Sequence, residues 1–161
     1  LNPFGSTRQA IGVYHPDLTE FYAQVLKDLG SERLYVVHGL IGMDEFSISG
    51  KTKITELKNG EITSNIYCPE DFQLSSAPIE TISGKDKETN KEILLSILQG
   101  KKSPARDVSV MNAALAIAVS GKTDTIQEGI KMAVESIDSG EAMKKYSQLI
   151  EFSRENQNVS E

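Results

Sequence analysis

Two adjacent carboxylates, Asp44 and Glu45, are the residues of this chain best suited to chemistry. They follow an apolar run, residues 34–37, in a loop that also contains Gly39 and Gly42. An apolar run that ends at such a loop is typical of a buried parallel strand, and ligands of open α/β sheets bind at the carboxyl ends of strands. Mg²⁺ needs few protein ligands because it keeps waters and shares the substrate's phosphates. The pair is therefore a candidate Mg²⁺ site, with a solvated surface pair as the alternative.

The chain around the pair must turn for both carboxylates to reach one ion, because neighbouring residues of a strand point to opposite faces. Strands are predicted at 9–14 and 33–38, with a helix between them that Gly30 ends. Strand, helix and strand within about 30 residues indicate a βαβ unit with a right-handed crossover. Asn59-Gly60, between two β-rich runs, predicts a tight hairpin.

The pattern from residue 86 onward is helical. Ser103-Pro104 predicts the start of a helix whose residues 108–119 are almost wholly apolar, so that helix should be buried on most sides. Asp124 is the expected cap of the next helix, and Ser139-Gly140 the break before a last one. We expect residues 1–154 to form part of an α/β domain and residues 155–161 to form a flexible tail.

Other polar residues have simpler interpretations. His38 ends a predicted strand and could be a ligand, a general base or a packed residue, of which a hydrogen-bonded structural group is the commonest. Asn112 lies in an apolar helix, and a buried amide must find partners, so a structural network is expected. Arg106 and Asp107, in the first turn of that helix, indicate a cap or an ion pair. No phosphate-binding glycine motif, CxxC pair or nucleophile set occurs, so no catalytic or cofactor-binding residue is assigned.

Composition excludes several classes of protein. The 161 residues carry a net charge of −6, which argues against a general nucleic-acid or membrane surface. The sequence has no apolar run near the roughly 18 residues of a membrane span. A single cysteine, Cys68, excludes an internal disulfide, is expected to pack as a small apolar residue, and fits a reducing, cytoplasmic compartment.

A set of short segments occurs in a fixed order along the chain. They are Leu1-Asn2-Pro3, Ile11-Gly12-Val13-Tyr14, Val36-Val37-His38-Gly39, Gly42-Met43-Asp44-Glu45, Pro69-Glu70-Asp71-Phe72, Pro104-Ala105-Arg106-Asp107, Asn112-Ala113-Ala114 and AVESIDSG at 133–140. As a set they resemble anthranilate phosphoribosyltransferase, from just after its phosphate-binding half to its C-terminus. The resemblance implies a phosphoribosyltransferase/nucleoside phosphorylase-like catalytic domain, with a mostly parallel sheet flanked by helices and an antiparallel hairpin.

The resemblance also implies a function. The family transfers the phosphoribosyl group of phosphoribosyl pyrophosphate to the amine of anthranilate in tryptophan biosynthesis, as a homodimer. Asp44 and Glu45 match its acidic pair, which holds a Mg²⁺ bridging to the donor's diphosphate. The family's GTGGD and KHGN segments, and the arginine that holds the anthranilate carboxylate, would precede Leu1. We therefore expect an incomplete, inactive fragment that lacks the N-terminal half, and the absent initiator Met agrees with this.

Two alternatives come from other classes. A nucleic-acid-binding, non-enzymatic relative of the same superfamily should show basic patches and could lose the acidic pair. A pyrimidine nucleoside phosphorylase relative is a second, enzymatic alternative. The sequence upstream of Leu1 would distinguish all three.

Overall fold

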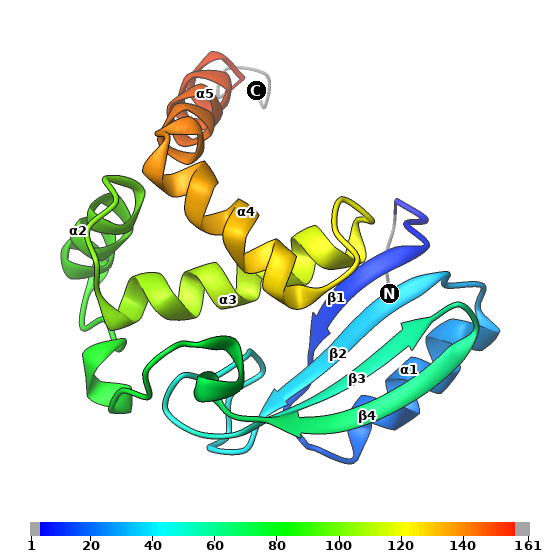
Figure 1. Ribbon diagram of the computed structural model, residues 1–161. Helices are drawn as coiled ribbons and strands as arrows, with labels where there is room; N and C mark the ends of the chain where they lie inside the picture. The colour runs from blue at the N-terminus through cyan, green and yellow to red at the C-terminus, as the bar shows by residue number, and fades with distance from the viewer. Residues whose placement is uncertain (1–3, 157–161) are drawn as a thin grey trace.

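The fold is a four-stranded sheet with helices on both faces, in a computed structural model that describes residues 4–156 (Figure 1). The segment Leu1-Asn2-Pro3 and positions 157–161 of the predicted tail lie outside the described residues. Residue 155, the first of that predicted tail, ends the last helix. No helix within 4–156 has the length and apolarity needed to cross a membrane.

The sheet has the order β1-β2-β3-β4 and is mixed. Its strands are β1 Arg8–Gly12, β2 Arg33–Gly39, β3 Thr52–Lys58 and β4 Glu61–Tyr67. Strands β1 and β2 pair in parallel, whereas β2–β3 and β3–β4 are antiparallel. The expectation of a mostly parallel sheet is therefore wrong for the described residues. A parallel pair needs a long crossover, and only β1 and β2 are joined by a helix, α1 Leu18–Asp28.

Strand β2 is the centre of the molecule, because all seven of its residues are buried. Leu34 and Val36 pack with α1 on one face of the sheet, and Tyr35 and Val37 pack in a second core with α3 on the other. This double burial explains the continuous apolar run, because a strand covered on both faces has no solvent side. The predicted βαβ unit is confirmed.

The hairpin that joins β3 to β4 is also confirmed. Asn59 and Gly60 have φ values of 53° and 79°. Positive φ at both central residues gives a turn whose twist matches that of the two strands, and Asn-Gly is the dipeptide that adopts it most readily. Strand β4 forms an edge of the sheet and is mostly exposed.

Four helices follow two short 3₁₀ turns, Pro69–Phe72 and Ile79–Thr81. They are α2 Lys87–Leu98, α3 Pro104–Val119, α4 Ile126–Asp138 and α5 Glu141–Glu155. Ser103 caps α3 as predicted, since its side chain accepts a hydrogen bond from the Arg106 N–H. The cap of α4 is Thr125 rather than Asp124, because Thr125 forms a reciprocal capping box with Glu128.

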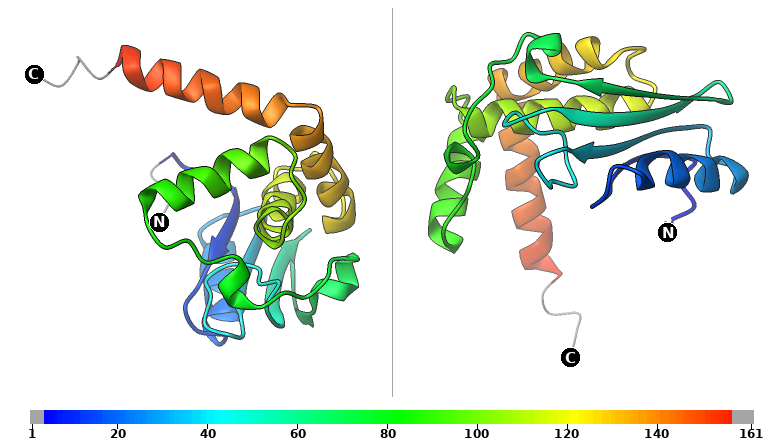
Figure 2. Two further views of the ribbon diagram at one scale, coloured as in Figure 1. Left: turned by 90° about the vertical axis from the view of Figure 1, so that its left-hand side faces the viewer. Right: turned by 90° about the horizontal axis from the view of Figure 1, so that it is seen from below.

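The helices bury very different amounts of surface. Helix α3 lies against the sheet, but Ala113 and Ala116 are exposed, so it is less enclosed than its apolar sequence predicts. Helix α4 crosses α3 closely at Gly129, where a Cβ would lie 2.6 Å from the Ala114 carbonyl oxygen. Helix α5 extends away from the rest of the fold and has no buried residue (Figures 1 and 2).

Candidate metal site

The carboxylate pair lies in the loop 40–51, which joins β2 to β3 at the carboxyl end of β2 (Figure 1). Gly39 begins a tight turn, in which its N–H donates to the Met43 carbonyl at 2.8 Å and its carbonyl accepts from the Met43 N–H at 3.1 Å. The chain then bends at Asp44 and at Glu45. The backbone turn that both carboxylates need to approach one ion is therefore present at the predicted edge of the sheet.

Both acidic side chains are exposed, and within residues 4–156 neither makes a hydrogen bond or an ion pair. No group of three or more His, Cys, Asp or Glu side chains that could hold a metal occurs among those residues either. Two free carboxylates do not make an all-protein metal centre. They fit a Mg²⁺ ion that takes its other ligands from water and from phosphate oxygens.

Gly12, the last residue of β1, supports the backbone beneath Asp44. A Cβ at position 12 would lie 1.5 Å from the Asp44 carbonyl oxygen, so only glycine lets the loop rest on the end of β1. The sequence places Gly12 in the predicted strand 9–14 and in one of the segments that resemble the family, but it indicates no role for Gly12 at the site. Its contact is with a residue on another element, so no local pattern could identify it.

Asn112, in the middle of α3, holds the residue that follows the pair. Its Oδ1 accepts from the Phe46 N–H at 2.9 Å, and its Nδ2 donates to the carbonyls of Phe46 at 3.1 Å and Val108 at 3.0 Å. The predicted structural network of Asn112 is confirmed. Its partner could not be predicted, because 66 positions separate the two residues.

His38 is a structural residue, as expected. It is 4 % exposed, and its Nδ1 lies 2.8 Å from the Val13 carbonyl oxygen. A carbonyl can only accept, so Nδ1 carries the proton. The bond ties the end of β1 to the end of β2, alongside the bond from the Val13 N–H to the Val37 carbonyl.

The remaining polar candidates also have structural partners. Arg106 is buried and pairs with Asp138 of α4 at 2.7 Å, which confirms the ion-pair interpretation. Asp107 is half-buried, and desolvation raises its pKa. Cys68 is only partly buried, and its thiol donates to Asp71, which raises the pKa of the thiol. The expectation that Cys68 packs as an apolar residue is therefore only partly met.

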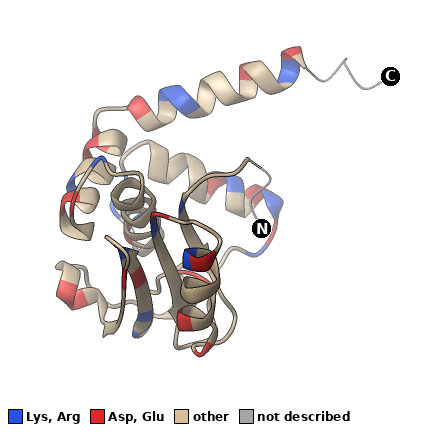
Figure 3. Ribbon diagram, turned by 90° about the vertical axis from the view of Figure 1, so that its right-hand side faces the viewer, with Lys and Arg blue, Asp and Glu red and all other residues tan. Residues whose placement is uncertain are grey.

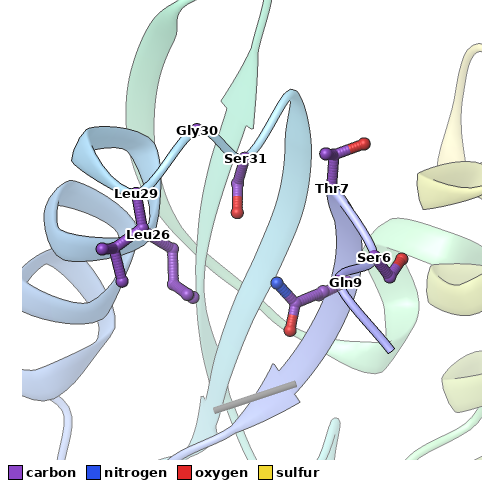
Figure 4. Close-up of a pocket in the computed structure, with 8 residues that line it drawn as sticks. Ser6, Thr7, Gln9, Leu26, Leu29, Gly30 and Ser31 are labelled. Atoms are coloured by element: carbon purple, nitrogen blue, oxygen red, sulfur yellow. The ribbon is translucent and has the colours of Figure 1, made fainter. Parts of the chain in front are cut away.

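A pocket of about 190 Å³ lies at the opposite end of β1 from the pair. It is formed by residues between the start of β1 and the end of α1, among them Gln9, Leu26, Leu29 and Ser31 (Figure 4). None of its lining residues is acidic, basic or a histidine. This pocket therefore offers no acidic or histidine metal ligand and no general acid or base of those types.

The fold and the loop belong to a known class of transferase domain. The family model described as "Glycosyl transferase family, a/b domain" matches residues 1–143, and the chain belongs to this family. Within it, the chain is 45 % identical over 152 residues to the anthranilate phosphoribosyltransferase of Rhodopseudomonas palustris (strain TIE-1). That match covers 94 % of this chain and 45 % of the relative.

Solved structures agree with this similarity. The anthranilate phosphoribosyltransferase of Thermus thermophilus superposes with a TM-score of 0.80 at 32 % identity, over 89 % of this chain and 42 % of that one. The Saccharomyces cerevisiae enzyme in complex with PRPP and Mg gives a TM-score of 0.72 at 30 % identity, over 84 % and 39 %. The resemblance seen in the sequence is confirmed. The chain spans less than half the length of these relatives.

Proposed function

We propose that this chain supplies the metal-binding part of an anthranilate phosphoribosyltransferase. The enzyme would transfer the phosphoribosyl group of phosphoribosyl pyrophosphate to the amine of anthranilate in cytoplasmic tryptophan biosynthesis. The observation that carries the proposal is the exposed Asp44–Glu45 pair at the carboxyl end of β2. Its side chains have no partner among residues 4–156, and its backbone is held by the turn at Gly39 and the contact with Gly12. The named relatives support the choice of reaction within the family.

The pair would act on the leaving-group side of the reaction. Asp44 and Glu45 would hold Mg²⁺ against the donor's diphosphate and orient that group away from the ribose carbon. When bound, the ion would neutralise the charge that develops on the departing pyrophosphate. Anthranilate is a weakly basic amine, so its nitrogen is unprotonated at neutral pH and needs little help from a general base before it attacks.

Positioning of the two substrates would come from outside these 161 residues. The family's GTGGD and KHGN segments do not occur in the sequence. The pair by itself cannot hold a ribose and an aromatic acid in reactive alignment, and alignment supplies much of the rate of such transfers. The proposal therefore includes a partner part of about the remaining length of the relatives, and a homodimer of the complete enzyme.

The charge distribution disfavours the nucleic-acid-binding alternative. Lys and Arg residues are interspersed with Asp and Glu along the ribbon (Figure 3), and the net charge is −6. Several basic groups are already paired, such as Lys53 with Glu20 at 2.8 Å. A polyanion needs a continuous basic surface to release its counterions.

A chimera tests the proposal directly. The upstream part of the R. palustris relative would be fused ahead of Leu1, and consumption of anthranilate would be followed with phosphoribosyl pyrophosphate and Mg²⁺. We expect Mg²⁺-dependent turnover by the chimera and none by the chain alone. Asp44→Ala/Glu45→Ala should lower turnover on the order of 10²-fold or more, because the lost charge acts most on the transition state.

The matched control removes two exposed carboxylates elsewhere, as Glu151→Ala/Glu155→Ala on α5. It should leave turnover unchanged. Neither double variant should change the free energy of unfolding by more than about 1 kcal/mol, since exposed charges contribute little to stability. Turnover by the Asp44/Glu45 variant at the level of the control, across a Mg²⁺ titration, would refute the metal assignment.

A further inference from the structure

The amide of Asn112 makes an unusually complete set of contacts with one residue of the metal loop. Both backbone groups of Phe46 bond to it, the N–H to Oδ1 and the carbonyl to Nδ2. The second Nδ2 hydrogen donates to the Val108 carbonyl, one turn earlier in α3. Both donor hydrogens of this half-buried amide are thus used, and its oxygen accepts one hydrogen bond and has one lone pair left.

Phe46 is the position at which the side chains of the loop become buried. Its side chain is fully buried and packs edge-on against Phe72, with ring centroids 5.5 Å apart. The residue before it is Glu45, which is exposed. The peptide between Glu45 and Phe46 therefore joins an exposed carboxylate to a buried side chain. Asn112 accepts a hydrogen bond from the N–H of this peptide.

We infer that Asn112 is a positioning residue for Asp44 and Glu45, acting through the backbone of Phe46. This inference rests on the proposed function, since it assumes that the pair binds a metal. The contact fixes the plane of the Glu45–Phe46 peptide, and with it the direction in which the Glu45 side chain leaves the backbone. Gly12 lies against the backbone of the preceding residue, Asp44. The two contacts together hold the pair from β1 and from α3.

Asparagine is the side chain that suits this task. It presents an acceptor and two donors in one plane, which match a backbone N–H and two carbonyls. Aspartate has the same shape but no donor. One of its oxygens could still accept from the Phe46 N–H, but the other would face the Phe46 and Val108 carbonyls as an acceptor. Leucine branches at the same carbon but is bulkier, and it satisfies none of the three backbone groups.

Binding of Mn²⁺ to the 161-residue chain, measured by the loss of the free-ion EPR signal, tests the inference without any substrate. We expect Asn112→Asp to weaken Mn²⁺ binding on the order of tenfold, the scale found when groups that orient metal ligands are removed. Asn112→Leu should do the same. The control, Val119→Ala, removes buried methyl groups from the same helix about 10 Å farther along its axis. It should destabilise the fold and leave Mn²⁺ affinity unchanged.

A further variant separates this inference from the proposed function. Asp44→Asn/Glu45→Gln should abolish saturable Mn²⁺ binding, and if it does not, the metal assignment itself is wrong. If that variant loses binding while Asn112→Asp folds and binds Mn²⁺ like the wild type, the positioning role of Asn112 is refuted. Equal weakening by Asn112→Asp and Val119→Ala would also refute it, because the effect would then be one of general stability.

Discussion

At the scale of single residues, the chemistry of the site is local but its geometry is not. Asp44 and Glu45 need only their own side chains to be candidate ligands, and the turn that begins at Gly39 bends the chain beneath them. Their placement depends on Gly12 from β1 and Asn112 from α3, which approach the loop from separate elements. Changes at these two positions should therefore disturb the pair without altering its charge.

Gly12→Ala should destabilise the protein because the new Cβ would meet backbone. It would lie 1.5 Å from the Asp44 carbonyl oxygen, and a backbone group cannot rotate away. We expect a loss of about 1–3 kcal/mol in the free energy of unfolding, the usual cost of forcing extra volume into a packed site. Urea denaturation measures it.

The control for Gly12→Ala is Gly84→Ala. Its Cβ would lie equally close, 1.5 Å, to Oδ1 of Asn90, but that atom ends a side chain that can turn into solvent. The loss there should stay within about 0.5 kcal/mol, as for most surface changes. Equal losses for the two variants would show that the loop backbone at Asp44 can move away from the new Cβ, so that Gly12 would not be needed to hold it in place.

At the scale of elements, α3 and α4 pack closely and are tied at both ends. The start of α3 is joined to the end of α4 by the Arg106–Asp138 ion pair. The turn between them is fixed by the capping box of Thr125 and Glu128, and Arg33 of β2 donates to the carbonyls of Thr123 and Asp124 in the same turn. These contacts hold α3, and therefore Asn112, in place against the sheet.

The stability of this helix pair should depend on pH through Glu128. The backbone N–H groups of Asp124 and then Thr125 lower the pKa of Glu128 below its usual 4.5. A carboxyl whose pKa is lower in the folded than in the unfolded state stabilises the fold fully above the unfolded value, and this contribution is lost as the pH falls through the folded value. Glu128→Gln should therefore reduce the fall in stability below about pH 4.5.

Thermal melts of the wild type and Glu128→Gln from about pH 6 to pH 3 test this prediction. Glu135→Gln, an exposed glutamate on the same helix, is the matched control and should melt in parallel with the wild type. If Glu128→Gln showed the same acid-induced loss as the control, the cap would not contribute to the acid sensitivity of the fold.

At the scale of the whole molecule, the chain has surfaces that nothing in its described part covers. Helix α5 buries no residue, and Leu149 and Phe152 on it are 61 % and 64 % exposed. Strand β1 is at the edge of the sheet, with one side unpaired within residues 4–156. Unpaired edges and exposed apolar residues favour association with another chain or segment.

The purified chain should therefore associate in a concentration-dependent manner. Leu149→Gln/Phe152→Gln should lower the mean mass in solution toward that of a monomer, because it removes the apolar contacts of α5. Ser147→Gln/Glu151→Gln, which changes exposed polar positions of the same helix, should have no effect. Light scattering over a concentration series measures both. A monomeric wild type at all concentrations would contradict the expectation that a covering part is missing.

The sequence by itself determined the elements and the chemistry of this chain. The Asn59-Gly60 turn and the Ser103 cap each follow from interactions within a few residues, so composition and spacing were enough to predict them. The continuous apolar run of β2 indicated a buried strand in the same way, although the helices that bury it could not be read from the run itself. Asp44 and Glu45 were singled out by their types and by the run that precedes them, and the resemblance to the family's acidic pair suggested their role as metal ligands. Their role as metal ligands stays a prediction.

Only the tertiary structure decided how the sheet pairs and what holds the site. The antiparallel pairing of β2 with β3 depends on the path of the loop 40–51, which no hydrophobic period encodes. The cap of α4 is not such a case, because Thr125 is chosen over Asp124 by its capping box with Glu128, a local pattern that the sequence already contains. The contacts of Gly12 and Asn112 join residues far apart in the chain, and such contacts form only when packing brings separate elements together.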